Sequence, residues 1–240
     1  MTDTVGPARW PQLALRLFPG EMPALSSFHP GSNPEVPSAV GRWVAGEGPW
    51  CVLLWGGSEV GKSYLLQGAL AALEARACNA MYLPLREAAP LGPELLEGLA
   101  SLDALCLDDV DAVAGDAAWN EALFVLYNQM QAAGRRLLLA TAPPPRDLRL
   151  VLPDLRSRLA GALVYHVLAL DDDARGEALV AAAARRGMQM PEAVCTYLLR
   201  RLPRRWQALT DALVRLDRAS LSAGRLLTVP FVREVLALDD

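Results

Sequence analysis

The stretch GGSEVGKS at residues 56–63 has the residue types and spacing of a phosphate-binding loop. Gly56, Gly61, Lys62 and Ser63 fill the pattern G-x-x-x-x-G-K-[ST]. Glycines let such a loop curl until its backbone N–H groups converge on phosphate oxygens, and the start of the following helix reinforces this attraction. Lys62, the single lysine of the chain, can reach the β- and γ-phosphates of a nucleotide. We therefore predict nucleotide contacts from Gly56, Gly57, Ser58, Glu59, Val60, Gly61, Lys62, Ser63 and Tyr64.

A second motif, which is acidic, follows the loop by about 50 residues. It is LCLDDVD at residues 105–111, and it ends an apolar run. Asp108 is placed to hold Mg²⁺ through water, as the Walker-B acid of a P-loop protein does, and the Ser63 hydroxyl can ligate the same ion. The alternative is that these acids simply cap the end of a strand. The predicted metal set is Ser63, Asp108 and Asp109.

Five apolar runs alternate with helix-like segments, a pattern typical of a parallel sheet covered by helices on both faces. The runs lie at 51–56, 79–85, 104–110, 136–142 and 163–170. After residue 170 the strand pattern ends, and segments with acidic starts and arginine-rich ends predict a small bundle of helices. We expect three parts: a flexible N-terminal arm (1–23), an α/β nucleotide-binding domain (24–170) and a helical domain (171–240).

Composition narrows the class of protein. The net charge of −4 argues against a general nucleic-acid binder, which usually carries a basic surplus. The 4 cysteines are widely scattered without metal-binding spacing, as expected of small buried side chains in a reducing compartment. The sequence has neither a signal-like N-terminus nor an apolar run of the roughly 18 residues that a membrane span needs. We therefore expect a cytoplasmic protein without membrane contact.

The order of these parts resembles the AAA+ family, in its bacterial initiator branch around DnaA and specifically among the regulators that inactivate DnaA. This order includes the motif LPDLRSRL (152–159) and the helical domain, which would be a lid. In addition, the segment LSSFHPGSNPEV (25–36) resembles the nucleotide-base motif of the family. The resemblance runs from Gln12 to Leu238, and it implies that Phe28 and Asn33 contact the nucleotide. DnaA itself continues into a helix-turn-helix domain, whereas this chain ends directly after the lid, so we expect no sequence-specific DNA binding.

The resemblance also implies a role for an arginine in LPDLRSRL. The corresponding residue, Arg158, would reach into the ATP of a neighbouring subunit as an arginine finger. A guanidinium placed at a transferring γ-phosphate stabilises charge in the transition state. Arg156 is a nearby competitor, and a plain solvated helix cation is the alternative.

The N-terminal PQLALRLFPG (11–20) alternates leucines with other residues, as a strand does. An ordinary edge strand is one interpretation. The resemblance favours another, the peptide with which these regulators dock on the DNA polymerase sliding clamp (beta subunit), although Arg16 stands where such peptides often carry proline. The clamp-binding residues would be Gln12, Leu13, Leu15, Leu17 and Phe18.

Three departures from the family concern hydrolysis of ATP by the chain itself. Asp109 stands where many relatives carry a catalytic glutamate, and Ala142, with Thr141 as its polar neighbour, stands where a polar sensor is usual. Gln207 aligns with the lid arginine that senses phosphates in DnaA, and Arg204 or Arg205 would have to replace it. These departures favour a site that holds ADP or ATP with Mg²⁺ and turns it over weakly or not at all.

Three functional hypotheses follow. The first is a nucleotide-bound adaptor that binds the clamp, stimulates ATP hydrolysis by DnaA through Arg158 in trans, and so limits replication initiation, either as a monomer or as a homodimer. The second is a self-sufficient P-loop ATPase that loads or remodels a replication protein, which the complete GKS motif supports. The third is a protein-binding scaffold only.

Overall fold

A computed structural model describes residues 23–203 and 205–238 of the chain. Residues 1–22, which contain the predicted clamp peptide and all of the arm but its last residue, lie outside the described residues, as do Arg204 and the last two residues, 239–240. Within the described ranges, no helix is long and apolar enough to cross a membrane.

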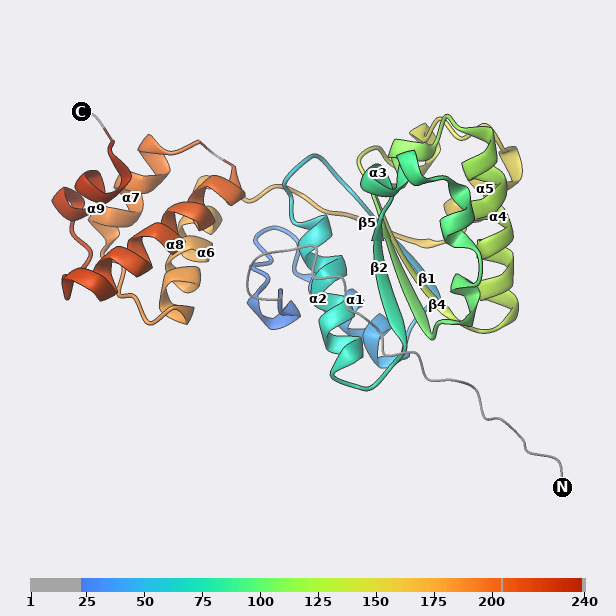
Figure 1. The fold of residues 1–240 in the computed structure, drawn as a ribbon, viewed down its shortest axis with the longest axis horizontal. Helices are drawn as coiled ribbons and strands as arrows, with labels where there is room; N and C mark the ends of the chain where they lie inside the picture. Colours follow the sequence, from blue (N-terminus) through green and yellow to red (C-terminus); the bar gives the residue numbers. More distant parts are fainter. Residues whose placement is uncertain (1–22, 204, 239–240) are drawn as a thin grey trace, which may run out of the picture.

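Five strands form a parallel sheet (Figure 1), and their order is β2-β3-β4-β1-β5. Their bounds lie within the five apolar runs, which confirms the predicted parallel sheet: β1 Cys51–Trp55, β2 Ala80–Pro84, β3 Ala104–Asp108, β4 Arg136–Thr141 and β5 Leu163–His166. In this order β1 lies between β4 and β5, with Trp55 opposite both Thr141 and His166. The loop that follows β1 therefore begins between the ends of its two neighbours.

Helices cover both faces of the sheet, as the continuous apolar strands predict (Figure 1). Alternate residues of one strand face opposite sides: Leu53 packs with α4 and α5, whereas Leu54 packs with α1 and α2. Both leucines are fully buried. The covering helices are α1 Glu35–Ala45, α2 Lys62–Glu74, α3 Leu85–Ala88, α4 Ala117–Ala132 and α5 Pro153–Ala160.

Short 3₁₀ turns connect these elements, and the sequence patterns did not predict them. They are η1 Leu25–Ser27, η2 Ala89–Leu91, η3 Pro93–Leu96, η4 Leu99–Ser101, η5 Val110–Val113 and η6 Pro145–Asp147.

The C-terminal helices form a separate bundle with its own apolar core, drawn in orange and red in Figure 1. Three of them confirm the predicted helical segments, and a fourth, α9, begins where Thr228 caps the backbone N–H of Phe231. Leu198, Leu213 and Val232 are among the fully buried residues that join the helices. The helices are α6 Asp172–Arg185, α7 Glu192–Arg201, α8 Trp206–Ala223 and α9 Val229–Leu236.

One buried polar side chain ties α4 to the segment that leads into α5. The Oδ1 atom of Asn120 accepts hydrogen bonds from the backbone N–H groups of Val151 (2.9 Å) and Leu152 (3.3 Å). Its Nδ2 atom donates to carbonyls before α4, including that of Ala114 at 3.0 Å. Because Asn120 is fully buried, these bonds replace contacts that water would otherwise make. They fix the start of α5, the helix that carries Arg158.

We expect Asn120→Ala to lower the free energy of unfolding by about 2–3 kcal/mol, because it leaves buried backbone groups without partners. Urea unfolding followed by circular dichroism measures this change. The matched control is Gln131→Ala on the exposed side of the same helix, which should change the free energy by less than about 0.5 kcal/mol. Equal effects of the two substitutions would show that the Asn120 bonds do not stabilise the fold.

Candidate nucleotide-binding site

The loop of residues 56–61 joins β1 to the start of α2, which is the context that the motif requires. Gly61, directly before α2, has φ 99°, a conformation that favours glycine. A Cβ atom built on Gly61 would lie 2.8 Å from Cε2 of Phe28, so the ring also excludes a side chain there. Phe28, which the sequence predicts to contact the nucleotide, therefore packs directly on the phosphate-binding loop.

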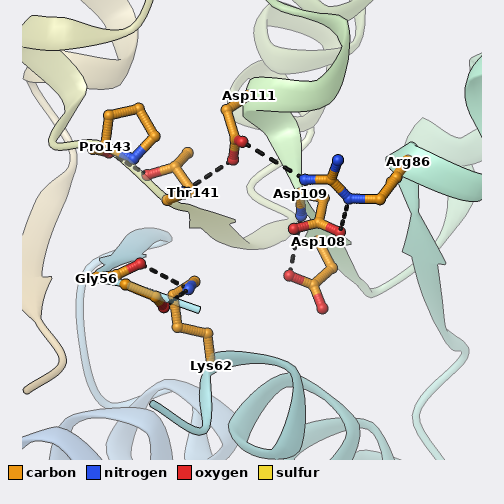
Figure 2. A network of polar contacts seen from close by, with 10 residues as sticks. Gly56, Lys62, Arg86, Asp108, Asp109, Asp111, Thr141 and Pro143 are labelled. Carbon is orange, nitrogen blue, oxygen red and sulfur yellow. Dashed lines mark hydrogen bonds and ion pairs between the residues drawn. The ribbon is translucent and has the colours of Figure 1, made fainter. Parts of the chain in front are cut away.

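Lys62 folds back over the loop (Figure 2). Its Nζ donates hydrogen bonds to the carbonyl oxygens of Gly56 (2.7 Å) and Gly57 (2.6 Å). The residue is only 8% exposed. Burial lowers the pKa of Lys62, and the negative field of Asp108 opposes that shift. An ammonium group thus lies inside the loop, where a phosphate anion would compete with the two carbonyls for it.

Asp108 ends β3 and is almost completely buried. Its Oδ2 accepts a hydrogen bond from the Tyr82 hydroxyl (2.8 Å), and its Oδ1 accepts one from the backbone N–H of Asp109 (2.9 Å). Burial and the neighbouring Asp108 raise the pKa of Tyr82, so the phenol remains a donor. The carboxylate is held in one orientation, and each oxygen keeps a lone pair for a further ligand.

The second acid of the motif is engaged by an arginine (Figure 2). Asp109 Oδ2 accepts from Arg86 Nε at 3.0 Å, and Nη2 of the same guanidinium lies 3.8 Å from Asp111 Oδ2. Asp111 Oδ1 in turn accepts from the backbone N–H of Ala142 (2.8 Å), at the position where a polar sensor is expected. Sequence reasoning missed Arg86 and Asp111, and the only available signal was the third acid in LCLDDVD.

The polar neighbour of Ala142 is also engaged. Thr141 is fully buried at the end of β4, and its hydroxyl donates to the carbonyl oxygen of Pro143 at 2.8 Å (Figure 2). The hydroxyl thus stabilises its own loop. A role for Thr141 as a sensor would require this bond to break.

Residues 28–33, here called the strap, run beside the loop and connect it to the segment after β5. Asn33 Oδ1 accepts from the backbone N–H of Leu168 (2.7 Å), and Asn33 Nδ2 donates to the Leu168 carbonyl (2.9 Å). Nδ2 also donates to Pro30 O at 3.0 Å. The polar atoms of this predicted nucleotide-binding residue are therefore engaged with backbone, and they hold the strap that carries Phe28.

A cleft separates the loop and strap from the helical domain. Its lining includes the predicted residues Phe28, Ser58, Glu59, Val60, Gly61 and Tyr64, and it includes Trp206 and Gln207 of α8. Gln207, at the position of the missing lid arginine, donates from Nε2 to Asp211 Oδ1 (2.8 Å). Arg205, one of the two suggested replacements, instead reaches the loop, where its Nε lies 2.8 Å from Glu59 Oε1.

The predicted metal residues do not make a dense cluster. No group of three or more histidine, cysteine or acidic side chains able to hold a metal ion is found in the described part of the chain. Magnesium binding therefore remains a prediction that depends on Ser63 and Asp108 acting with water and nucleotide oxygens, which is how Mg²⁺ usually binds at phosphates.

Arg158 lies outside this cleft, on the exposed side of α5. Its backbone carbonyl accepts a hydrogen bond from the Tyr127 hydroxyl at 3.2 Å, which anchors the helix to α4. Among the ion pairs found in residues 23–203 and 205–238, neither Arg158 nor Arg156 takes part. Both guanidinium groups are thus exposed to solvent, as a partner-facing arginine must be.

The sheet order, the loop between β1 and α2, the acids at the end of β3 and the appended helical domain define an AAA+ type P-loop protein. The family model of the bacterial DnaA ATPase domain matches residues 92–166, and the model of the Hda lid domain matches residues 172–236. Over these residues the chain is therefore similar to the DnaA-related AAA+ proteins, with a lid domain like that of Hda.

Solved structures share this fold. Domain III of the replication initiation protein DnaA from Thermotoga maritima is similar with a TM-score of 0.70 and 19% identity, covering 89% of this chain and 95% of that one. AMPPCP-bound DnaA from Aquifex aeolicus has a TM-score of 0.70 and 21% identity, covering 84% and 67%. A RuvB variant from Thermotoga maritima is also similar, with a TM-score of 0.66 and 16% identity over 90% and 71%. At these identities the likeness concerns the fold alone.

We expect Lys62→Ala to weaken ADP binding at least about tenfold, because it removes the cation that lies inside the loop. Isothermal titration calorimetry on the purified chain measures the Kd. Arg76→Ala removes an exposed cation from the turn after α2, and it should leave the Kd within about twofold. Unchanged ADP binding by Lys62→Ala would exclude the loop as the phosphate site.

Proposed function

We propose that this chain is a nucleotide-bound regulator of replication initiation that stimulates ATP hydrolysis by DnaA. The observation that carries the proposal is the combination of a DnaA-type ATPase domain, an Hda-type lid and an exposed Arg158 that forms no ion pair with described residues. Domains of one type can pack head to tail, with one face of each domain against a different face of the next. A chain with a DnaA-like fold is therefore a suitable neighbour for DnaA.

ADP or ATP would lie in the cleft, with its phosphates at residues 56–63 and its base near Phe28. Support comes from the buried ammonium of Lys62 and from the ring of Phe28 on the loop. Two similar solved structures contain DnaA with AMPPCP. Magnesium would neutralise phosphate charge, with Ser63 and Asp108 as the residues that hold it.

Weak hydrolysis by the chain itself is part of the proposal. Asp109 is paired with Arg86, and Asp111 contacts Arg86 and the Ala142 N–H, so the charge of both carboxylates is partly offset and they are poorer groups for activating a water. Gln207 is paired with Asp211. The competing hypothesis, a self-sufficient ATPase, requires these contacts to rearrange, and a turnover of about 1 s⁻¹ or more by the purified chain would favour it.

In the complex, Arg158 would approach the γ-phosphate of ATP held by DnaA. The guanidinium stabilises charge that develops on the transferring phosphoryl group, and such a residue accelerates hydrolysis by about 10³–10⁵ in known P-loop pairs. The bond cleaved belongs to the partner's nucleotide, and this chain contributes a positive charge at the correct position.

The arm would determine where this happens. Residues 12–18 would dock as an extended peptide in an apolar groove of the DNA polymerase sliding clamp. Because clamps are ring oligomers, a peptide of modest affinity can concentrate several copies near DNA-bound DnaA. A cytoplasmic location and a homodimeric resting form are compatible with the proposal, which requires no sequence-specific DNA binding by this chain.

We expect Arg158→Ala to abolish stimulation of DnaA–ATP hydrolysis on clamp-loaded DNA, because the transition-state charge is no longer stabilised. Phosphate release from radiolabelled ATP measures it. Arg156→Ala, on the same exposed helix, is the matched control and should keep at least about half of the stimulation. Normal stimulation by Arg158→Ala, or its loss in Arg156→Ala alone, would reject Arg158 as the finger.

A Leu15→Ala/Leu17→Ala double variant tests the tether. It should lose clamp binding in surface plasmon resonance by at least about tenfold, because two buried leucine contacts are removed. It should also lose stimulation on clamp-loaded DNA, whereas Arg158→Ala should still bind the clamp. Thr4→Ala, in the same arm but outside the peptide, serves as the control. Clamp binding that survives the double substitution would reject this docking site.

A further inference from the structure

Glu59 occupies an unusual position within the phosphate-binding loop. It has φ 62°, a left-handed conformation that costs little for glycine and more for a residue with a Cβ atom. Residues held in such conformations often serve a functional site. The side chain is also acidic, in a loop whose predicted ligand is a polyphosphate. Both features make glutamate an unfavourable choice unless the carboxylate itself has a role.

The carboxylate has one contact that supplies a role. Glu59 Oε1 accepts a hydrogen bond from Arg205 Nε at 2.8 Å, across the cleft and 146 residues away in the chain. Arg205 directly precedes α8, so this ion pair connects the lid to the phosphate-binding loop. The Glu59 carboxylate therefore gives Arg205 of the lid an anionic partner on the loop.

In the described part of the chain, a charged contact also joins the lid to the strap, and it does not involve the loop. His29 Nε2 lies 3.3 Å from Glu177 Oε2 on α6, and Asn33 binds the Leu168 backbone before the lid begins. Among described residues, Glu59–Arg205 is the ion pair that links lid and loop.

We propose that Glu59 is a resident anion that holds Arg205 in the absence of phosphate, and that a bound nucleotide displaces it. The inference rests on the proposed nucleotide binding at this loop. In the empty state the carboxylate satisfies the guanidinium. When a polyphosphate enters, Arg205 exchanges Glu59 for phosphate oxygens, and the position of the lid becomes coupled to the occupancy of the loop.

The charges and exposure of the two groups suit such an exchange. Arg205 is 71% exposed and Glu59 35% exposed, so the pair is weak and breaks at small cost. A phosphate group offers the planar fork of a guanidinium more negative charge and more acceptor oxygens than one carboxylate. Gln207 cannot supply this charge, because it is neutral and bonded to Asp211. Among the described lid residues, Arg205 is therefore the cation whose ion pair reaches the loop.

The exchange and a static contact predict opposite changes in ADP affinity when Glu59 is substituted. If Glu59 competes with phosphate, Glu59→Gln should tighten ADP binding by about fivefold, because it removes both the competitor and a like charge near the phosphates. The gain should shrink when Arg205→Gln is present, because no cation remains to be released. If the pair only clamps the lid shut, Glu59→Gln should weaken ADP binding.

Isothermal titration calorimetry on the full chain, with ADP and with adenosine, tests this. The variants are Glu59→Gln, Arg205→Gln and the double substitution, and Glu59→Gly serves as a second loop variant that also relieves the left-handed strain. Glu177→Gln removes the other lid ion pair, and Arg225→Gln breaks a pair with Glu234 inside the lid. Both controls should leave the ADP Kd within about twofold. Adenosine has no phosphate, so its Kd should not respond to Glu59→Gln.

Tighter ADP binding by Glu59→Gln and Glu59→Gly, with a smaller gain in the Arg205→Gln background, supports the exchange. Unchanged or weaker ADP binding by Glu59→Gln overturns it, as does an equal gain for adenosine. If the wild-type chain binds ADP and the Glu59 variants bind it with the same Kd, the exchange is wrong but the proposed nucleotide binding stands. If the wild-type chain binds neither ADP nor ATP, both proposals fail.

Discussion

The site depends on one constraint, which is the order of five parallel strands whose carboxyl ends lie along the same edge of the sheet. Because β1 lies between β4 and β5, the phosphate-binding loop is fixed on both sides by backbone hydrogen bonds. Gly56 N donates to Thr141 O at 3.3 Å, and Val167 N donates to Trp55 O at 2.7 Å. The same order places the acids of β3 one strand beyond β4, within the electrostatic reach of Lys62. The strap is held at Leu168, in the segment that follows β5 and leads to the lid.

On the proposed function, charge balance at this edge would let the site hold a nucleotide and hydrolyse it poorly. Lys62 and Arg86 face three carboxylates, those of Asp108, Asp109 and Asp111. The acids exceed the cations by one formal charge, so on the proposed function a polyphosphate would enter with a divalent cation of its own. Arg86 offsets the carboxylates that could orient water, whereas Lys62 remains inside the loop. On the proposed function, the reactive charge of this protein is therefore found elsewhere, on the exposed surface of α5.

Local patterns predicted much of this molecule. The five apolar runs, the loop motif and the capped lid helices each arise from neighbours in the chain, and all were confirmed as elements. The contacts that decide chemistry were not predictable in this way. Arg86 meets Asp109, and Arg205 meets Glu59, only after the sheet order and the lid position are set. Asn33 illustrates the same limit, because its motif predicts a nucleotide contact while the fold engages its amide with the Leu168 backbone.

On the proposed function, hydrolysis occurs on the partner's nucleotide. The most direct test loads DnaA with radiolabelled ATP and this chain with unlabelled ADP, mixes them on clamp-bearing DNA, and follows release of labelled phosphate in a single turnover. We expect rapid release that depends on this chain. With the label exchanged, so that this chain carries the labelled ATP and DnaA carries ADP, we expect no acceleration. Rapid release only when the label is on this chain would contradict hydrolysis on the partner's nucleotide and identify a self-sufficient ATPase.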